Sequence, residues 1–131
     1  MSFSIRVIQP SNFLSSAAIN RFHAEIKSIL ESDATMILVD LSNITTISSS
    51  SFLGVVKAFQ SVRVAKRQLF LCSMNEQIRI LFELTGLDQV FKTFADSDDF
   101  NRYLQAQENL VEVSRPIKHS LVQRDSMKLA S

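Results

Sequence analysis

The sequence has few of the residues that form covalent cross-links, metal sites or phosphate-binding loops. Its 131 residues include one cysteine, two histidines and two glycines. Cys72 alone cannot form an internal disulfide, which favours a protein of a reducing compartment. His23 and His119 are distant in the chain and give no metal-ligand spacing, and two glycines cannot build a glycine-rich phosphate loop. We therefore expect no metal and no cofactor.

Long apolar runs and signals of secretion or serine catalysis are also missing. No stretch reaches the roughly 18 apolar residues of a membrane span, and the N-terminus lacks a basic start followed by an apolar signal core. These absences predict a soluble cytoplasmic protein without a membrane partner. There is no G-x-S-x-G motif, and the only histidines fall in the first predicted helix and in the C-terminal tail. We expect no enzymatic activity.

The composition suits one globular domain, with 46% hydrophobic and 21% charged residues. The formal net charge is only +1, but the charges are unevenly distributed. Between Asp40 and Glu76 there is no acidic residue, and this segment contains Lys57, Arg63, Lys66 and Arg67. Seven acidic residues then occur from Glu76 to Glu108. The pattern predicts a basic outer face on the central helix and an acidic partner; without interleaved aromatic residues it does not predict nucleic-acid binding.

A buried strand followed by a serine-capped helix forms the predicted centre of the fold. The apolar run at residues 36–41 is typical of a central strand buried on both faces, with Asp40 at its exposed end. Four consecutive serines, residues 48–51, then lead into a helix. Large apolar groups recur on one side of that helix, at Phe52, Val55, Val56 and Phe59. A serine at the N-cap satisfies a free N–H group of the first turn, and the helix dipole favours negative charge there, so a phosphate would be tolerated.

The remaining pattern alternates helices with short strands. The expected elements are a strand over residues 3–8, a short partner strand over 12–14, a helix capped by Ser15 or Ser16, a strand over 68–72, a helix opened by a Ser73/Glu76 capping box and ended at Gly86, a strand over 90–94, and a helix from Ser97. This order predicts an α/β or α+β sheet flanked by helices. We assign residues 1–108 to the domain and residues 109–131, where the periodicity fades, to a flexible or loosely docked tail.

The segment from Asp40 to Phe52, DLSNITTISSSSF, resembles STAS domains, the fold of bacterial anti-sigma factor antagonists. In that family a strand ends in Asp-Leu, and an apolar pair precedes Asp-Ser-Ser-Gly-Leu at a helix start. Aligned from Asp40 without a gap, Ser49 falls on the family's phosphorylatable serine and Ser50 on the serine after it. Ser48 stands in place of the usual Asp, and Ser51 in place of the usual Gly. The likeness extends over residues 3–104, and the stretch LCSMNEQIRILFELTGLDQVFKTFADSDDF also resembles the family's last strand, helix and strand.

The resemblance implies a single STAS-like domain of α/β class, with a mixed sheet of four to five strands, helices packed mainly on one side, and no catalytic chemistry. It also implies a switch. The unphosphorylated antagonist docks on an anti-sigma factor serine kinase, phosphorylation by that kinase releases it, and a cognate phosphatase resets it. Ser49 is then the expected phosphorylation site, with Ser48, Ser50 and Ser51 as alternatives. A phosphoserine brings about −1.5 to −2 charges at pH 7, which an interface fitted to a neutral hydroxyl does not accommodate.

The expected partner-binding surface consists of Asp40, Ser50, Leu53, Lys57 and Gln60. Leu53 lies outside the buried stripe, and with Lys57 and Gln60 it can form an exposed ridge beside Ser49. Simpler interpretations stay open: the serines as an unmodified helix cap, and Asp40 as a hydrogen-bonding residue that supports the loop. The alternative function is a STAS-type structural subunit of a transport or other assembly without a phosphorylation cycle, which the loss of Asp at position 48 favours. Pairing with a second copy as a homodimer is also left open.

Overall fold

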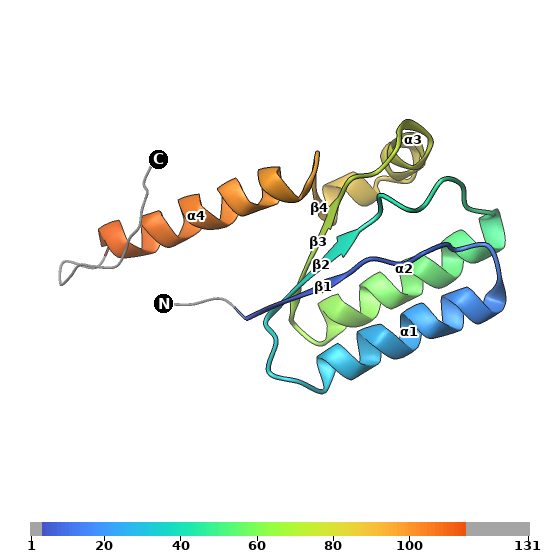
Figure 1. Cartoon of the computed structure of the whole chain (residues 1–131), viewed down its shortest axis with the longest axis horizontal. Helices are drawn as coiled ribbons and strands as arrows, with labels where there is room; N and C mark the ends of the chain where they lie inside the picture. Colours follow the sequence, from blue (N-terminus) through green and yellow to red (C-terminus); the bar gives the residue numbers. More distant parts are fainter. Residues whose placement is uncertain (1–3, 115–131) are drawn as a thin grey trace.

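The computed structural model describes residues 4–114, which form one parallel sheet with helices on both faces (Figure 1). The strands are β1 (Ile5–Ile8), β2 (Met36–Asp40), β3 (Gln68–Cys72) and β4 (Lys92–Phe94); the helices are α1 (Ser16–Leu30), α2 (Ser49–Val64), α3 (Glu76–Thr85), the short 3₁₀ helix η1 (Leu87–Gln89) and α4 (Ser97–Ser114). The strand order is β1-β2-β3-β4, and each neighbouring pair is parallel. No helix within these residues is long and apolar enough to cross a membrane.

Different helices cover the two faces of the sheet because alternate strand residues point to opposite faces. Ile37 and Val39 of β2 belong to the larger core, which they share with buried residues of α1, α2 and α3. Met36 and Leu38 of the same strand belong to a smaller core that includes Phe100 of α4. Figure 1 shows α1 and α2 side by side on one side of the sheet and α4 extending away on the other. The strand β2 is therefore buried on both faces, as its continuous apolar run predicts.

The predicted α/β class, the single sheet and the placement of helices mainly on one face are confirmed. The predicted stripe on α2 is also confirmed, because Val55 and Phe59 are buried and Phe52 and Val56 pack partly buried against the same core. Aromatic rings connect the helices on this face of the sheet: Phe59 lies with its ring centroid 6.0 Å from that of Phe22 of α1 and 6.2 Å from that of Phe82 of α3. These contacts fix where α2, and so the serines at its start, stand on the sheet.

The mixed pairing expected of the sheet does not occur among the described strands, which pair only in parallel. The short partner strand predicted over residues 12–14 is also wrong, because these residues form no strand. The Asn12 side chain accepts a hydrogen bond from the Leu14 N–H at 2.9 Å and turns the chain there, while Phe13 inserts into the core. The hydrogen bond to the Asn12 side chain and the burial of Phe13 therefore replace the extended strand that the sequence predicts for these residues.

The predicted starts of α3 and β4 are wrong by a few residues. Ser73 has a left-handed φ of 65°, which an N-cap residue does not adopt, and Asn75 caps α3 by accepting from the Ile78 N–H at 2.9 Å. The helix η1 occupies residues 87–89, so the last strand begins at Lys92 and not at residue 90.

Helix α4 continues past the predicted domain end at residue 108, to Ser114. The remainder of the predicted tail, residues 115–131, lies outside the described residues.

Candidate functional site

The candidate site lies where β2 ends and α2 begins, at the carboxyl edge of a parallel sheet. Such edges are where open α/β sheets usually place their binding residues, because the connecting loops gather there. We call residues 41–51 the serine loop; it leaves Asp40 at the end of β2 and enters α2 at Ser49. Every serine predicted as a phosphorylation site falls within this segment.

The first of the four serines, Ser48, is the N-cap of α2. Its backbone is extended, its hydroxyl oxygen accepts from the Ser51 N–H at 3.2 Å, and its carbonyl accepts from the Phe52 N–H at 2.8 Å. The Ser50 hydroxyl lies 3.3 Å from the Ser48 hydroxyl, and the two form a hydrogen bond. Ser51 is the one buried serine of the run. The predicted serine cap is thus confirmed and assigned to Ser48.

Ser49 differs from its three neighbours. It is the first helical residue of α2, it is exposed, and among the hydrogen bonds of the described residues none involves its hydroxyl. The first turn of α2 contains no acidic residue, so the positive end of the helix dipole is not compensated by a carboxylate of its own turn. The Ser49 hydroxyl is therefore accessible in a place that favours an added negative charge.

The predicted ridge continues from Ser49 along α2. Leu53, Lys57 and Gln60 are all exposed, and Leu53 exposes 64% of its surface although it is apolar. Residues 49, 53, 57 and 60 follow one another at spacings of four, four and three, which places them along one side of a helix. The structure therefore brings Ser49 and the ridge together on one exposed strip, with Ser50 next to it.

Asp40 is half-buried and holds the first residues of the serine loop. Its Oδ1 accepts from the Ser42 N–H at 2.9 Å, and its Oδ2 accepts from the Gln9 side-chain amide at 3.5 Å. The same Gln9 amide donates to the Ser42 hydroxyl at 2.9 Å. Residues at the carboxyl ends of β1 and β2 therefore hold the start of the loop together. These bonds support the interpretation of Asp40 as a structural residue; a direct contact between Asp40 and a partner stays a prediction.

Asn75 is a residue of this site that the sequence interpretation missed. Its side-chain amide donates to the carbonyls of Ile44 at 3.3 Å and Thr45 at 2.9 Å, in the middle of the serine loop. An asparagine directly before the helix of residues 76–85 is itself a recognised N-cap signal. Its second role, across 30 residues of chain, has no local signature.

Helix α1 supports the second turn of α2. Gly54 approaches Ile19 so closely that a Cβ added to the glycine would lie 2.8 Å from the Ile19 Cγ2 atom. The Nε2 atom of His23 lies 2.8 Å from the Gly54 carbonyl oxygen and donates to it in the matching tautomer. His23 is thus a helix-packing residue, and the close contact depends on the missing side chain of Gly54.

A shallow apolar groove of about 230 Å³ borders the site on the side of α3. It is lined by Thr46, Ile47, Gln77, Ile78, Ile80, Leu81 and Leu84. Leu84 exposes 80% of its surface and Ile80 exposes 41%. Apolar side chains are therefore exposed on both sides of the serine loop, on α2 at Leu53 and on α3 at Leu84.

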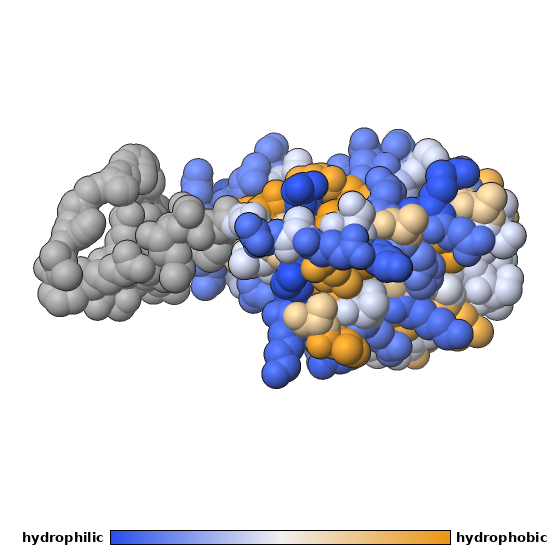
Figure 2. All heavy atoms as spheres, turned by 90° about the horizontal axis from the view of Figure 1, so that it is seen from below, coloured by the Kyte–Doolittle hydropathy of each residue, from blue (hydrophilic) through white to orange (hydrophobic). Residues whose placement is uncertain are grey.

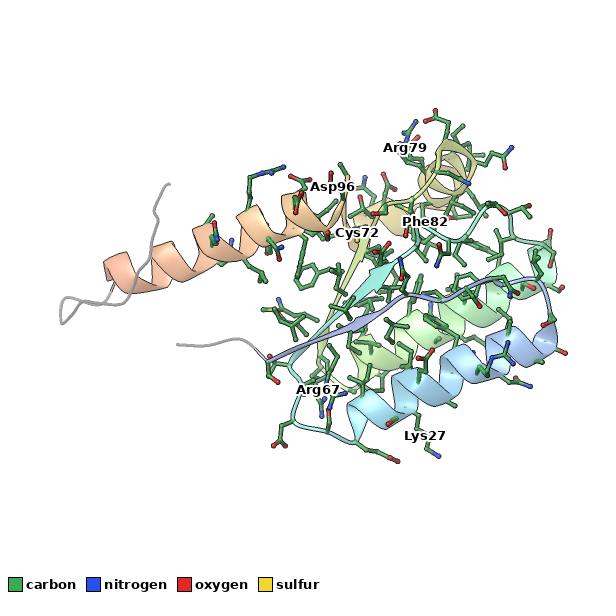
Figure 3. The ribbon with its side chains drawn as sticks, viewed as in Figure 1. Lys27, Arg67, Cys72, Arg79, Phe82 and Asp96 are labelled. Atoms are coloured by element: carbon green, nitrogen blue, oxygen red, sulfur yellow. The ribbon has the colours of Figure 1, made fainter. Side chains whose placement is uncertain are left out.

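The basic face predicted for the central helix is smaller than expected. Lys57, Arg63 and Lys66 are exposed, but Arg67 is half-buried at the end of the sheet where α1 finishes (Figure 3). Its guanidinium donates to the carbonyls of Ala34 at 2.7 Å and Leu30 at 3.0 Å. Arg67 is therefore a bridge between α1 and the start of β2, and only three of the four basic residues are available to a partner.

Local burial and ion pairing explain the pKa shifts of Cys72 and Glu76. Burial raises the pKa of the Cys72 thiol, which lies between the sheet and α4 (Figure 3), and the charges of Asp40 and Asp96 raise it further. Hydrogen bonding and charge from Arg79 lower the pKa of the Glu76 carboxyl in an exposed pair on α3. Within residues 4–114, no three His, Cys, Asp or Glu side chains are grouped to hold a metal ion.

Comparison with known proteins identifies the fold. The STAS domain family matches residues 3–100 of the chain. The crystal structure of a proposed anti-sigma factor antagonist from Thermotoga maritima is 22% identical, covers 85% of this chain and 88% of its own, and superposes with a TM-score of 0.61. An NMR structure of the same Thermotoga maritima protein, also 22% identical, covers 88% of this chain and 86% of its own with a TM-score of 0.57. No curated protein sequence matches significantly.

Proposed function

Because this chain belongs to the STAS domain family, we propose that it is a non-enzymatic regulatory binding protein of the anti-sigma factor antagonist type. It docks on an anti-sigma factor that is also a serine kinase, and phosphorylation of Ser49 ends the docking. A cognate phosphatase restores the unmodified protein. The structural likeness to a proposed anti-sigma factor antagonist supports this kind of function.

The observation that carries the proposal is the contrast between Ser49 and the other three serines. The Ser48 hydroxyl caps the helix, the Ser50 hydroxyl bonds to it, and Ser51 is buried. A kinase that modified any of these three would first have to break a hydrogen bond or expose a buried group. Ser49 requires neither, and it is the position that aligns with the family's phosphorylatable serine.

Phosphorylation at Ser49 can abolish docking without unfolding the protein. A phosphate at the first residue of α2 interacts favourably with the helix dipole and with the N–H groups of the first turn. In the docked state the negative charge of this phosphate lies against a surface that accommodated a neutral hydroxyl. Burying it costs several kcal/mol unless the partner supplies compensating charge. The switch therefore acts on the interface and leaves the fold intact.

The composition of the exposed surface fits reversible docking. Figure 2 shows one face of the molecule, on which hydrophobic residues form small patches separated by hydrophilic side chains. Permanent interfaces usually bury larger continuous apolar areas. The ridge of Leu53, Lys57 and Gln60 offers one apolar anchor and two polar contacts, a composition suited to an interface that forms and dissociates.

The proposal is tested by replacing Ser49 and measuring binding to each anti-sigma-type serine kinase of the source organism, expressed one at a time. We expect Ser49→Ala to bind like the wild type and Ser49→Asp to bind roughly 30-fold more weakly or worse, because an uncompensated charge buried in an interface costs about 2 kcal/mol or more. Ser16→Asp is the matched control, since Ser16 is the exposed first residue of α1 and is likewise preceded by a serine cap. Equal binding of Ser49→Ala and Ser49→Asp would refute the switch.

The second candidate is a STAS-type structural subunit of a larger assembly without a phosphorylation cycle. Two observations favour it: Ser48 replaces the family's aspartate, and α4 continues to Ser114 and extends away from the sheet (Figure 1). A projecting helix can attach a domain to another protein. Intact mass and phosphopeptide mapping of the protein from its own cells separates the candidates, because phosphate on Ser49 supports the switch and its absence under several growth conditions supports the scaffold. Deleting the segment from Leu110 onward should then disrupt the assembly.

A further inference from the structure

The side chain of Asn75 connects the serine loop to helix α3. Its Oδ1 atom accepts from the Ile78 N–H at 2.9 Å, while its Nδ2 group donates to the Thr45 carbonyl at 2.9 Å and to the Ile44 carbonyl at 3.3 Å. Only one orientation of the amide satisfies all three contacts, because the oxygen must face an N–H and the nitrogen must face two carbonyls. Asn75 therefore performs two separable tasks, capping α3 and holding the loop.

The backbone around Asn75 is arranged to bring it to the loop. Ser73 has a φ of 65°, in the left-handed region that is unfavourable for a residue with a side chain. Its N–H bonds to the Phe94 carbonyl of β4 at 3.3 Å, so Ser73 is still held by β4 at the point where the chain leaves β3. A strained residue persists when its surroundings determine its conformation, and here the bonds of Asn75 are among those surroundings.

Three fastenings then hold the serine loop along its length. Asp40 bonds to Ser42 at the beginning, Asn75 bonds to the carbonyls of residues 44 and 45 in the middle, and Ser48 caps α2 at the end. The beginning of the loop is also held from elsewhere in the chain, by the Gln9 bond to Ser42 and by the Leu41 N–H bond to the Cys72 carbonyl, whereas the middle of the loop is held by Asn75. Without it, the segment between Ser42 and Ser48 keeps the Ile44 N–H bond to Leu41, the burial of Ile44 and the packing of the half-buried Ile47 against the core.

We propose that Asn75 is the positioning residue of the serine loop, which holds Ser49 in the orientation that a kinase or partner recognises and links it to α3. The value of this role for signalling rests on the proposed function, but the physical hold on the loop does not. Loosening the loop changes recognition at Ser49 without removing any group that touches the partner there.

The test uses replacements that keep the cap and remove the donor. In Asn75→Ser and Asn75→Asp a side-chain oxygen still caps α3, since serine and aspartate are as good as asparagine at an N-cap, but no amide faces residues 44 and 45. Hydrogen exchange of the full chain should show the N–H groups of Ile44, Ser51 and Phe52 exchanging roughly tenfold faster in both variants. The N–H groups of Ile78 and Arg79 should exchange as in the wild type. Asn12→Asp is the control, because Asn12 also accepts a backbone bond through its oxygen.

The outcomes separate this inference from the proposed switch. Unchanged exchange at Ile44, Ser51 and Phe52, or equal acceleration at α3, would show that Asn75 is only a helix cap and would overturn the proposal. Phosphate occupancy of Ser49 in the source cells provides the functional readout, and we expect it to fall in Asn75→Ser. Equal occupancy in the variant and the wild type overturns the positioning role while the switch stands. If the wild type carries no phosphate, the switch fails, and the exchange rates still decide whether Asn75 holds the loop.

Discussion

The close contact of α1 and α2 at Gly54 leads to a prediction about stability. Whether Gly54→Ala raises or lowers the free energy of unfolding depends on a single methyl group of Ile19. A Cβ added at Gly54 would lie 2.8 Å from the Cγ2 atom of Ile19, closer than van der Waals contact allows. Ile19 is buried and branched at Cβ, so its Cγ2 methyl cannot rotate away cheaply. In Gly54→Ala the two helices must therefore separate, and the bond between His23 and the Gly54 carbonyl must lengthen.

Two opposing effects set the size of the change in the free energy of unfolding. Replacing glycine by alanine inside a helix ordinarily stabilises it by about 1 kcal/mol. Forcing an extra methyl into a packed contact costs about 1–3 kcal/mol. The steric term exceeds the propensity term over most of that range, so we expect Gly54→Ala to lower the free energy of unfolding by about 1 kcal/mol, which is roughly 4 °C in Tm for a domain of this size.

A double-mutant cycle with Ile19→Leu isolates the steric term. Leucine keeps the volume of isoleucine but lacks the Cγ2 branch, so the single Ile19→Leu change should cost less than about 1.5 kcal/mol. In that background Gly54→Ala should become stabilising, and urea denaturation of the four proteins should give a coupling energy of about 1–3 kcal/mol. If Gly54→Ala raises stability in the wild-type background, the helices have room at this position and the argument for a required glycine is refuted.

Two further predictions concern the ends of the sheet. Arg67→Met should lower the free energy of unfolding by about 2–3 kcal/mol in urea, because two carbonyls, those of Leu30 and Ala34, lose charged donors; Arg67→Lys should recover little of it, since an ammonium does not reproduce the guanidinium fork. Burial raises the pKa of Cys72, so its neutral thiol contributes stability at low pH that is lost as pH rises past the ordinary thiol value of 9.0 toward the folded pKa. Above pH 9 the Tm should therefore fall less steeply with pH in Cys72→Ala than in the wild type. Equal slopes of Tm against pH would contradict the raised pKa of Cys72.

Elements set by local patterns could be predicted from the sequence, and those set by tertiary contacts could not. The strands β2 and β3 follow from continuous apolar runs, and the buried side of α2 follows from its helical spacing. The capping box at Ser73 was a sound local signal, but β3 leaves the sheet through a left-handed residue at that position. The chain then needs two more residues before an extended N-cap can form, and Asn75 takes that place.

The fastenings of the serine loop were beyond local reasoning for the same reason. Gln9 meets Asp40 across 31 residues, and Asn75 meets Ile44 across the same separation. Neither pair has a spacing that a helix or a strand would make recognisable. The exposed ridge on α2 could be anticipated because helical periodicity alone decides which residues face away from the core. Its contact with a partner is a separate matter that periodicity does not address.

The two departures from the family's serine motif have different physical consequences. At position 51 the family's glycine is replaced by a serine that lies within α2, where any residue with a side chain adopts the helical backbone, so the loop does not need glycine there. At position 48 serine replaces aspartate, and both are good N-caps, so the helix start is preserved as well. What changes is the charge: a carboxylate at the cap would repel a phosphate on the adjacent Ser49, whereas the neutral Ser48 does not. A phosphate on Ser49 should therefore be held more firmly at the start of α2 than in a relative with aspartate, and the stability gained on phosphorylation should shrink in Ser48→Asp.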